Sequence, residues 1–222
     1  MKIGIISEGK GDLGVIDNIL KGITNLDTSN FKHIRPSDDL DETDLALGDK
    51  TRSTWSLVKE ECISGDAISS FFKLENSKYV VIHIDTDRAQ DFEVNIPTRD
   101  ENFCEVVRER VIEKINSWLD GRFPDCVFYA VAIEEIEAWL LTIYKPKKES
   151  SLQPNPKKAL EFVLGKKGID TTSSYNNYRQ LSKPFLKEKE ILVGKFLDYN
   201  CSLRLFYEEI KAMWAIENPN QA

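Results

Sequence analysis

Several signatures of familiar protein classes are missing from this sequence. Its 4 cysteines lie far apart without a Cys-x-x-Cys pair, so neither a zinc site nor a disulfide framework is indicated. We expect reduced, partly buried thiols instead. With only 2 histidines, a zinc site built on imidazole is also not indicated.

Long apolar runs are missing as well. None reaches the length that a helix needs to cross a bilayer. The segment after Met1 reaches Glu8 too early to contain the apolar core of a signal peptide. We therefore expect a cytoplasmic protein that does not associate with a membrane.

Nucleotide-binding motifs are missing from the glycine-containing loop at residues 7–11. No Gly-Lys-Ser/Thr follows it, so it is not a P-loop, and the Gly-x-Gly-x-x-Gly pattern of dinucleotide-binding proteins is also absent. Gly9 and Gly11 still allow the backbone to turn sharply near a helix N-terminus, a place suited to phosphate. If ATP takes part in the activity, a partner ATPase must supply it.

The composition is that of a globular protein with an uneven charge. The chain has 222 residues, of which 41% are hydrophobic and 30% charged, and its net charge is −7. Residues 1–144 carry 16 basic and 28 acidic groups, which gives −12, whereas residues 145–222 carry 14 and 9, which gives +5. This split suits an acidic part that holds cations and a basic part that meets a polyanion, although solvated surfaces explain it too.

The hydrophobic pattern alternates between strands and helices. Short apolar runs predict strands at 2–7, 31–35, 79–84 and 126–132. Helical spacing follows from an N-cap at Asp12, over 54–74 with a break at Gly65, and over 101–119. Such alternation favours an α/β fold with a parallel sheet between helices.

Two further parts of the chain differ in charge: an acidic segment at 38–44 and a basic stretch, interrupted by prolines, that begins at Lys145. The sequence predicts an acidic, solvated loop at 38–44 and short C-terminal helices at 157–164, 175–192 with a break at Pro184, and 202–216. We therefore predict an acidic metal-binding domain over residues 1–145 and a small, basic, mainly helical extension over residues 146–222.

Acidic residues follow three of the predicted strands. Glu8 comes after the first, Asp85 and Asp87 after the third, and Glu134 and Glu137 lie on a helix predicted to start directly after the fourth. The carboxyl ends of parallel strands share one edge, where carboxylates repel one another unless a cation neutralises them. Mg²⁺ or Mn²⁺ suits such oxygen ligands. Two structural alternatives stay open: Asp commonly forms turns after strands, and Glu in a first helical turn opposes the helix dipole.

The order of these motifs resembles the Toprim domain of topoisomerases, primases and OLD-family nucleases. The matching features are a strand followed by Glu8-Gly9 with Asp12, and a strand followed by Asp85-Thr86-Asp87. The segment 137–141, Glu-Ala-Trp-Leu-Leu, is similar to one that recurs in a small Toprim-like family often encoded beside ATPases in bacterial defence loci. The resemblance covers roughly residues 1–145.

The resemblance implies cleavage of phosphodiester bonds in DNA or RNA by metal-activated water. Asp85 and Asp87 would hold metal, Glu8 would be a ligand or general acid/base, and Asp12 a further ligand. Either Glu134 or Glu137 would complete the site. No tyrosine stands at a position that would identify it as the nucleophile of a topoisomerase, so strand passage is not expected. The implied metal residues are Glu8, Asp12, Asp85, Asp87, Glu134 and Glu137, and the catalytic ones Glu8, Asp85 and Asp87.

Two classes of function follow from these features. The first is a Mg- or Mn-dependent nuclease, an effector in phage defence, for which an ATPase partner and assembly into a homo-oligomer both stay open. Basic groups beside aromatic residues suit nucleic-acid contact, although packing explains the same aromatics. The second is a non-catalytic Toprim-like regulatory or binding module, since net acidity is unusual for a protein that grips DNA alone. A phosphoryl or nucleotidyl transferase also fits the metal chemistry. The residues expected to contact nucleic acid are Lys10, Arg88, Lys157, Lys158, Lys166 and Lys167.

Overall fold

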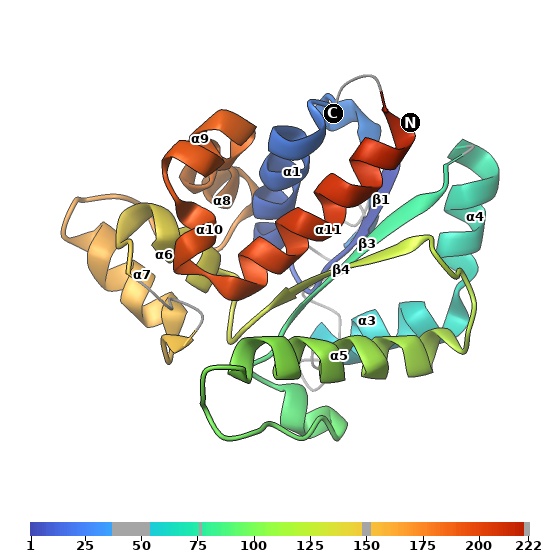
Figure 1. Ribbon diagram of the computed structural model, residues 1–222, viewed down its shortest axis with the longest axis horizontal. Coiled ribbons are helices and arrows are strands. Elements are labelled where there is room, and N and C mark those ends of the chain that lie inside the picture. The colour runs from blue at the N-terminus through green and yellow to red at the C-terminus, as the bar shows by residue number, and fades with distance from the viewer. Residues whose placement is uncertain (37–53, 76, 148–151, 220–222) are drawn as a thin grey trace.

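The computed structural model describes residues 1–36, 54–75, 77–147 and 152–219. Its centre is a parallel sheet with the strand order β2-β1-β3-β4 (Figure 1). The predicted α/β class is therefore confirmed, and β1 and β3 are the two central strands. The strands are β1 (Ile3–Ile6), β2 (Phe31–Arg35), β3 (Tyr79–Asp85) and β4 (Val127–Ala132). The acidic segment 38–44 lies outside the described residues.

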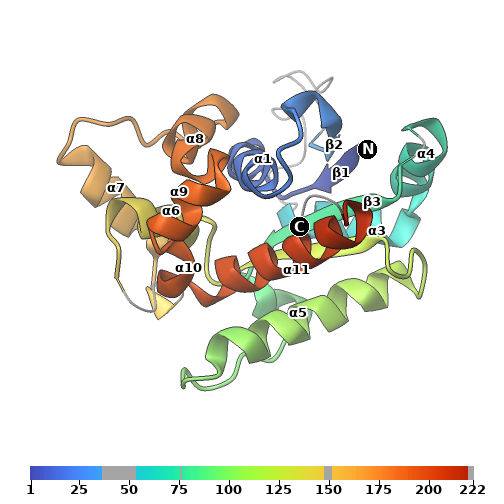
Figure 2. The ribbon, with the colours of Figure 1, turned by 45° about the horizontal axis from the view of Figure 1, so that its top comes forward.

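Helices cover both faces of this sheet (Figure 2). On one face lie α1 (Lys10–Thr24), α6 (Glu137–Tyr144) and α11 (Cys201–Glu217), and on the other α3 (Thr54–Ser64), α4 (Asp66–Glu75) and α5 (Phe103–Leu119). The remaining helical segments are the 3-10 turns η1 (Thr28–Asn30), η2 (Ala89–Phe92) and η4 (Lys183–Leu186) with α7 (Pro156–Gly165), α8 (Tyr175–Leu181), α9 (Glu188–Val193) and α10 (Phe196–Tyr199).

Side chains of β3 alternate between the two layers, as the pleat of a strand requires. Val80, Ile82 and Ile84 belong to the core with α3 and α5, whereas Val81 belongs to the core with α1 and α11. His83 and Asp85 follow Val81 at intervals of two residues. They therefore share its face of the sheet, beneath α1 and α6.

The predicted helix boundaries are partly confirmed. Gly65, with φ +66, separates α3 from α4 as expected, and η4 interrupts the C-terminal helical pattern around Pro184. The expectation that Asp12 caps α1 is wrong, because the helix begins at Lys10 with Gly9 as its N-cap. Asp12 lies at the third helical position, where its Oδ2 accepts the backbone N–H of Gly9 at 2.9 Å.

The C-terminal helices pack directly on α1. Asn18 Nδ2 donates to the backbone carbonyl of Arg179 at 2.8 Å and to Ser182 Oγ at 2.7 Å. Gly14 and Gly22 lie on the surface of α1 that faces α8 and η4, where the absence of a side chain allows this close approach. Residues of α8 to α11 consequently share one hydrophobic core with β1 and α1. Among the described residues, no helix has the length and apolar character needed to cross a membrane.

Gly22→Ala tests this packing. A methyl group at Gly22 would lie 2.0 Å from the carbonyl oxygen of Phe185, so α1 and η4 would have to separate. We expect the free energy of unfolding to fall by about 2 kcal/mol or more, the usual size for overpacking. Gly165→Ala is the matched control, because no atom lies within 4 Å of the position that its methyl group would take, and stability should stay the same or rise slightly. Urea unfolding measures both, and equal midpoints for the two variants would contradict the close approach of η4 to α1.

Candidate metal centre

Asp85, the last residue of β3, is fixed through its backbone on both sides. Its N–H donates to Glu8 Oε1 at 2.6 Å, and its carbonyl oxygen accepts from Trp55 Nε1 at 2.8 Å. The side chain is only 16% exposed, and within the described part of the chain Oδ1 is buried without a hydrogen-bond partner. A buried carboxylate oxygen without a donor is costly, and a cation would supply the missing partner.

The loop between β1 and α1 brings two further acids to this edge. Glu8 bonds the Asp85 N–H through one oxygen and accepts from the Thr54 hydroxyl through the other. Ser7 Oγ donates to the carbonyl oxygen of Gly9 at 2.8 Å and helps to fix the turn that leads into α1. Asp12, one turn into the neighbouring helix, is buried. The predicted convergence of acids from β1, α1 and β3 on one sheet edge is therefore present.

His83 lies between two of these acids, and the sequence alone suggested no role for it. Its Nε2 is 3.4 Å from Asp85 Oδ1 and its Nδ1 is 3.7 Å from Asp12 Oδ2. The imidazole is fully buried, and neither contact has hydrogen-bond geometry within the described residues. The strand period could have revealed it, because a residue two places before Asp85 must point to the same face.

The loop after β4 is joined to the Asp85-Thr86-Asp87 turn by backbone hydrogen bonds. Thr86 and Asp87 donate their N–H groups to the carbonyl oxygen of Glu134 at 2.9 and 3.0 Å. The N–H of Glu134 donates to Thr86 Oγ1 at 2.8 Å. These bonds hold Glu134 in the left-handed region, with φ 66. The predicted helix start at residue 133 is therefore wrong, and α6 begins at Glu137.

Glu134 and Glu137 consequently have different surroundings. The Glu134 carboxylate forms an ion pair with Arg99. Glu137 is 4% exposed, and its Oε1 accepts from the Tyr178 hydroxyl at 2.5 Å. Of the two glutamates that the sequence left open, Glu137 is the one buried beneath the sheet edge, and its electrostatic interaction with Asp85 reflects their proximity. Tyr178 was not predicted, since it follows Glu137 by 41 positions.

Burial gives these carboxyl groups unusual proton affinities. It raises the pKa of Asp12 to about 8, and it raises the pKa of Asp85 well above its ordinary value, with the charges of Glu8 and Glu137 adding to the effect. Burial also raises the pKa of Glu8 and of Glu137. Each shift means that the ionised form lacks sufficient compensation, which a bound cation would provide.

The acids lie around the sheet edge, but their carboxylate oxygens are not close enough together to form a compact set of ligands. In the ranges 1–36, 54–75, 77–147 and 152–219, only one group of three His, Cys, Asp or Glu ligand atoms lies mutually within 4.8 Å, and it contains none of these acids. Asp87 is exposed. A shared ion would therefore draw the carboxylates inward, against the repulsion that separates like charges without one.

The predicted nucleic-acid residues lie in two places. Arg88 is exposed in the loop after β3, where Nη2 forms an ion pair with Asp91 at 2.8 Å, and Lys10 begins α1. The other four are exposed at the two ends of α7: Lys157 and Lys158 in its first turn, and Lys166 and Lys167 just beyond its last residue.

The first turn of α7 adjoins the loop after β4, because the backbone N–H of Lys157 donates to Glu135 Oε2 at 3.2 Å. At the other end, Lys166 Nζ lies 4.0 Å from the centre of the Phe162 ring, which is 63% exposed. One basic end of α7 is thereby linked to the same sheet edge, and its other basic end carries an exposed aromatic residue.

The comparisons with known proteins gave no match. No family model matches this sequence, and neither the curated proteins nor the solved structures compared with it contain a match. The resemblance to the Toprim domain rests on the motif residues themselves, above all Glu8, Asp12, Asp85 and Asp87.

The raised pKa values predict how the stability of the metal-free protein changes with pH. A carboxyl group whose pKa is higher in the folded chain favours folding while it is protonated, and this advantage is lost as pH rises from its unfolded value through its folded value. For Asp12 the interval runs from 3.8 to about 8. We expect the free energy of unfolding to fall between about pH 5 and about pH 8 in the presence of a chelator.

Asp12→Asn should remove part of this dependence and be more stable than the wild type at about pH 8 by about 1 kcal/mol or more. Asp27→Asn is the control, since that carboxylate is 83% exposed. Protein that a chelator keeps free of metal is unfolded with urea at about pH 5 and at about pH 8. A wild-type stability that rises across the interval, or the same change for Asp12→Asn and Asp27→Asn, would contradict the buried acid cluster.

Proposed function

We propose that this protein is a divalent-metal-dependent nuclease with a Toprim-like domain. The observation that carries the proposal is the buried Asp85 carboxylate, whose Oδ1 lacks a hydrogen-bond donor among the described residues. Glu8, Asp12 and Glu137 surround it and all interact with it electrostatically. A hard cation is the partner that such a set of oxygens requires.

The donor set fits Mg²⁺ or Mn²⁺, and the imidazole of His83 favours Mn²⁺. Asp85 and Asp12 would hold the ion, with His83 between them and Glu8 close by. Mg²⁺ prefers oxygen alone, whereas Mn²⁺ also accepts an imidazole nitrogen. When bound, the metal supplies an activated water and neutralises charge on the phosphate and leaving oxygen.

The other groups position this set, and one further acid lies exposed beyond it. Glu8 holds the backbone N–H of Asp85, and Tyr178 holds Glu137, so two of the acids have fixed orientations. Thr86 joins the turn after β3 to the loop after β4. Asp87 is exposed beyond this turn, which suits a role toward substrate or a second ion.

The basic ends of α7 provide a path for the polyanion. Lys157 and Lys158 start beside the loop after β4, and Lys166 and Lys167 extend the positive charge along the helix. Lysines neutralise phosphates without reading sequence, and Phe162 offers a ring for stacking. The motif resemblance extends this proposal to cleavage of DNA or RNA in phage defence, together with an ATPase partner.

A second candidate is a Toprim-like module that binds a partner without catalysis. Two observations favour it. Glu134 is paired with Arg99 and Glu137 with Tyr178, so each of these carboxylates already has a partner within the protein. In addition, no three acids of this edge lie mutually within 4.8 Å among the described residues.

Asp85→Asn distinguishes the two candidates. The substitution keeps the shape of the side chain and removes its charge, so it should abolish metal binding while the backbone bonds to Glu8 and Trp55 persist. We expect cleavage of DNA or RNA with Mn²⁺ to fall by roughly 100-fold or more, at least as much as the loss of a supporting residue causes. Single- and double-stranded substrates of both kinds are incubated with the full chain and Mn²⁺ or Mg²⁺.

The control for this experiment is Asp27→Asn, which removes a charge on the exposed surface and should cleave like the wild type. Calorimetry with Mn²⁺ is measured on all three proteins. Mn²⁺ binding to the wild type without cleavage of any substrate would favour the module. Equal Mn²⁺ affinity of the wild type and Asp85→Asn would exclude this metal centre altogether.

The lysines of α7 are tested by a quadruple substitution to alanine, which should weaken nucleic-acid binding and flatten its salt dependence. Loss of up to four phosphate contacts should lower the slope of log K against log salt by roughly 3, at about 0.7–0.9 per contact. Hydrolysis of the small diester bis(p-nitrophenyl) phosphate should be unchanged, because it does not reach α7. The substituted residues are Lys157, Lys158, Lys166 and Lys167.

The matched control carries the same change in charge on β2, α3, α4 and α5, away from α7 (Figure 1). It should keep the wild-type slope. If both quadruple variants lower the slope equally, the effect is one of net charge and α7 is not the nucleic-acid path. The control substitutions to alanine are at Lys32, Lys59, Lys73 and Lys114.

A further inference from the structure

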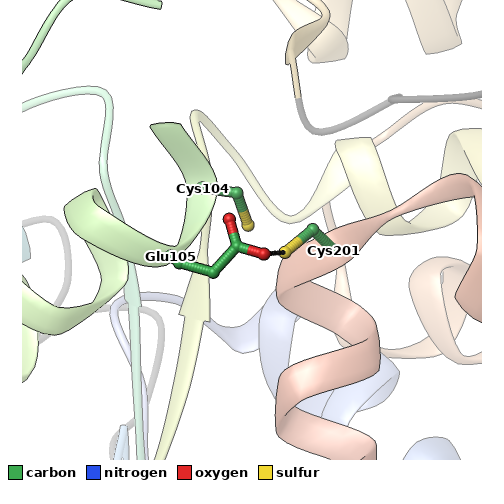
Figure 3. A group of neighbouring side chains, drawn as sticks. All are labelled: Cys104, Glu105 and Cys201. Carbon is green, nitrogen blue, oxygen red and sulfur yellow. Dashed lines mark hydrogen bonds between the residues drawn. The ribbon is translucent and has the colours of Figure 1, made fainter. Parts of the chain in front are cut away.

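A second group of ligand-type side chains lies at the start of two helices. Cys104 and Glu105 are in the first turn of α5, and Cys201 is the first residue of α11. Their two sulfur atoms and a carboxylate oxygen lie mutually within 4.8 Å. Figure 3 shows the three side chains turned toward one another from the two helices. We propose that Cys104, Glu105 and Cys201 form a binding site for Zn²⁺ or a similar thiophilic divalent cation.

The spacing of the three atoms suits one ion. Cys201 Sγ donates to Glu105 Oε1 at 3.1 Å. Two sulfur ligands on a tetrahedral zinc ion lie roughly 3.8 Å apart, given Zn–S bonds of about 2.3 Å. The side chains therefore reach coordinating positions by small rotations, with a water as the fourth ligand.

The charges around the group also fit a bound cation. Two thiolates and one carboxylate around Zn²⁺ carry a net charge of −1. Arg204 Nη2 lies 3.7 Å from both Glu105 Oε1 and Cys201 Sγ, so it balances that charge. The N-termini of α5 and α11 add positive potential that stabilises thiolates. Binding would replace the two S–H bonds by Zn–S bonds and release two protons to solvent, and no group would change its oxidation state.

A metal fits this pair of cysteines better than a disulfide does. Both cysteines are free thiols, and the Cys201 thiol donates to a carboxylate oxygen of Glu105. Glu105 would also have no function in a disulfide, whereas it is a third ligand for zinc.

The site would join the two layers around the edge of the sheet. β4 is an edge strand, with α5 on one face and α11 on the other. Ser202, next to Cys201, accepts from Trp139 Nε1 at 2.8 Å, which fixes the start of α11 beside α6. A metal at Cys201 and Cys104 would therefore tie α11 to α5 beyond β4, near the carboxyl end of that strand.

Cobalt titration of the full-length, reduced protein tests the proposal. Co²⁺ bound to thiolates gives a near-ultraviolet charge-transfer band, which an oxygen-only site does not. We expect the band in the wild type, its displacement by Zn²⁺ but not by Mg²⁺, and a melting temperature that rises with Zn²⁺. Cys104→Ser and Cys201→Ser should lose the band and the thermal shift, and Glu105→Gln should bind roughly tenfold more weakly.

Two controls separate this site from other effects. Cys126→Ser removes a partly exposed cysteine elsewhere and should keep the band, and Asp85→Asn should keep it because the acids of the candidate metal centre are not ligands here. Circular dichroism establishes that each variant is folded. No band in the wild type, or an equal band in Cys104→Ser, overturns the proposal. A disulfide would be indicated if two thiols were lost in air and restored by dithiothreitol while the reduced protein gave no cobalt band. That result also overturns the proposal.

Discussion

The hydrogen bond from the Asp85 N–H to Glu8 Oε1 is the interaction on which the candidate centre depends. It joins the end of β3 to the loop after β1, two strands that are neighbours at the middle of the sheet. Through this bond the start of α1 and the turn after β3 have fixed relative positions. Oδ1 of Asp85 is left beneath α1 without a donor among the described residues, so the edge that this bond orders also holds a buried oxygen without a partner.

The features that depend on local sequence could be predicted. The apolar run at 79–84 is covered on both faces in β3, as expected, because such runs form buried parallel strands. Acids after parallel strands had to meet at one edge, and Glu8, Asp85 and Glu137 do. The strand and helix order thus followed from periodicity alone. Two helix starts were displaced by a few residues: α1 begins earlier, with Gly9 as its N-cap, and α6 begins later, after Glu134 in its left-handed conformation.

The contacts that span long stretches of chain could not be predicted. Tyr178 reaches Glu137 across 41 positions, and Cys201 reaches Glu105 across 96. Spacing along the sequence carries no signal for such pairs, which is why the cysteines were expected to be isolated thiols. The ion pair of Arg99 with Glu134 is a further contact of this kind. It separates Glu134 from the acids around Asp85, and it depends on the fold of the loop after β4.

The two ligand groups at the carboxyl edge of the sheet differ in chemistry, and this difference would separate the metals that they bind. Oxygen ligands with a single imidazole, as around Asp85, would favour Mn²⁺, whereas two sulfurs with one carboxylate would favour Zn²⁺. The first group lies between the central strands β1 and β3, and the second lies beyond the edge strand β4, where α5 and α11 meet. Zinc at the second would hold the layers together around β4, whose terminal loop also bonds the turn that follows Asp85. A metal that only stabilises the fold would thereby hold the candidate centre around Asp85 in position without being part of it.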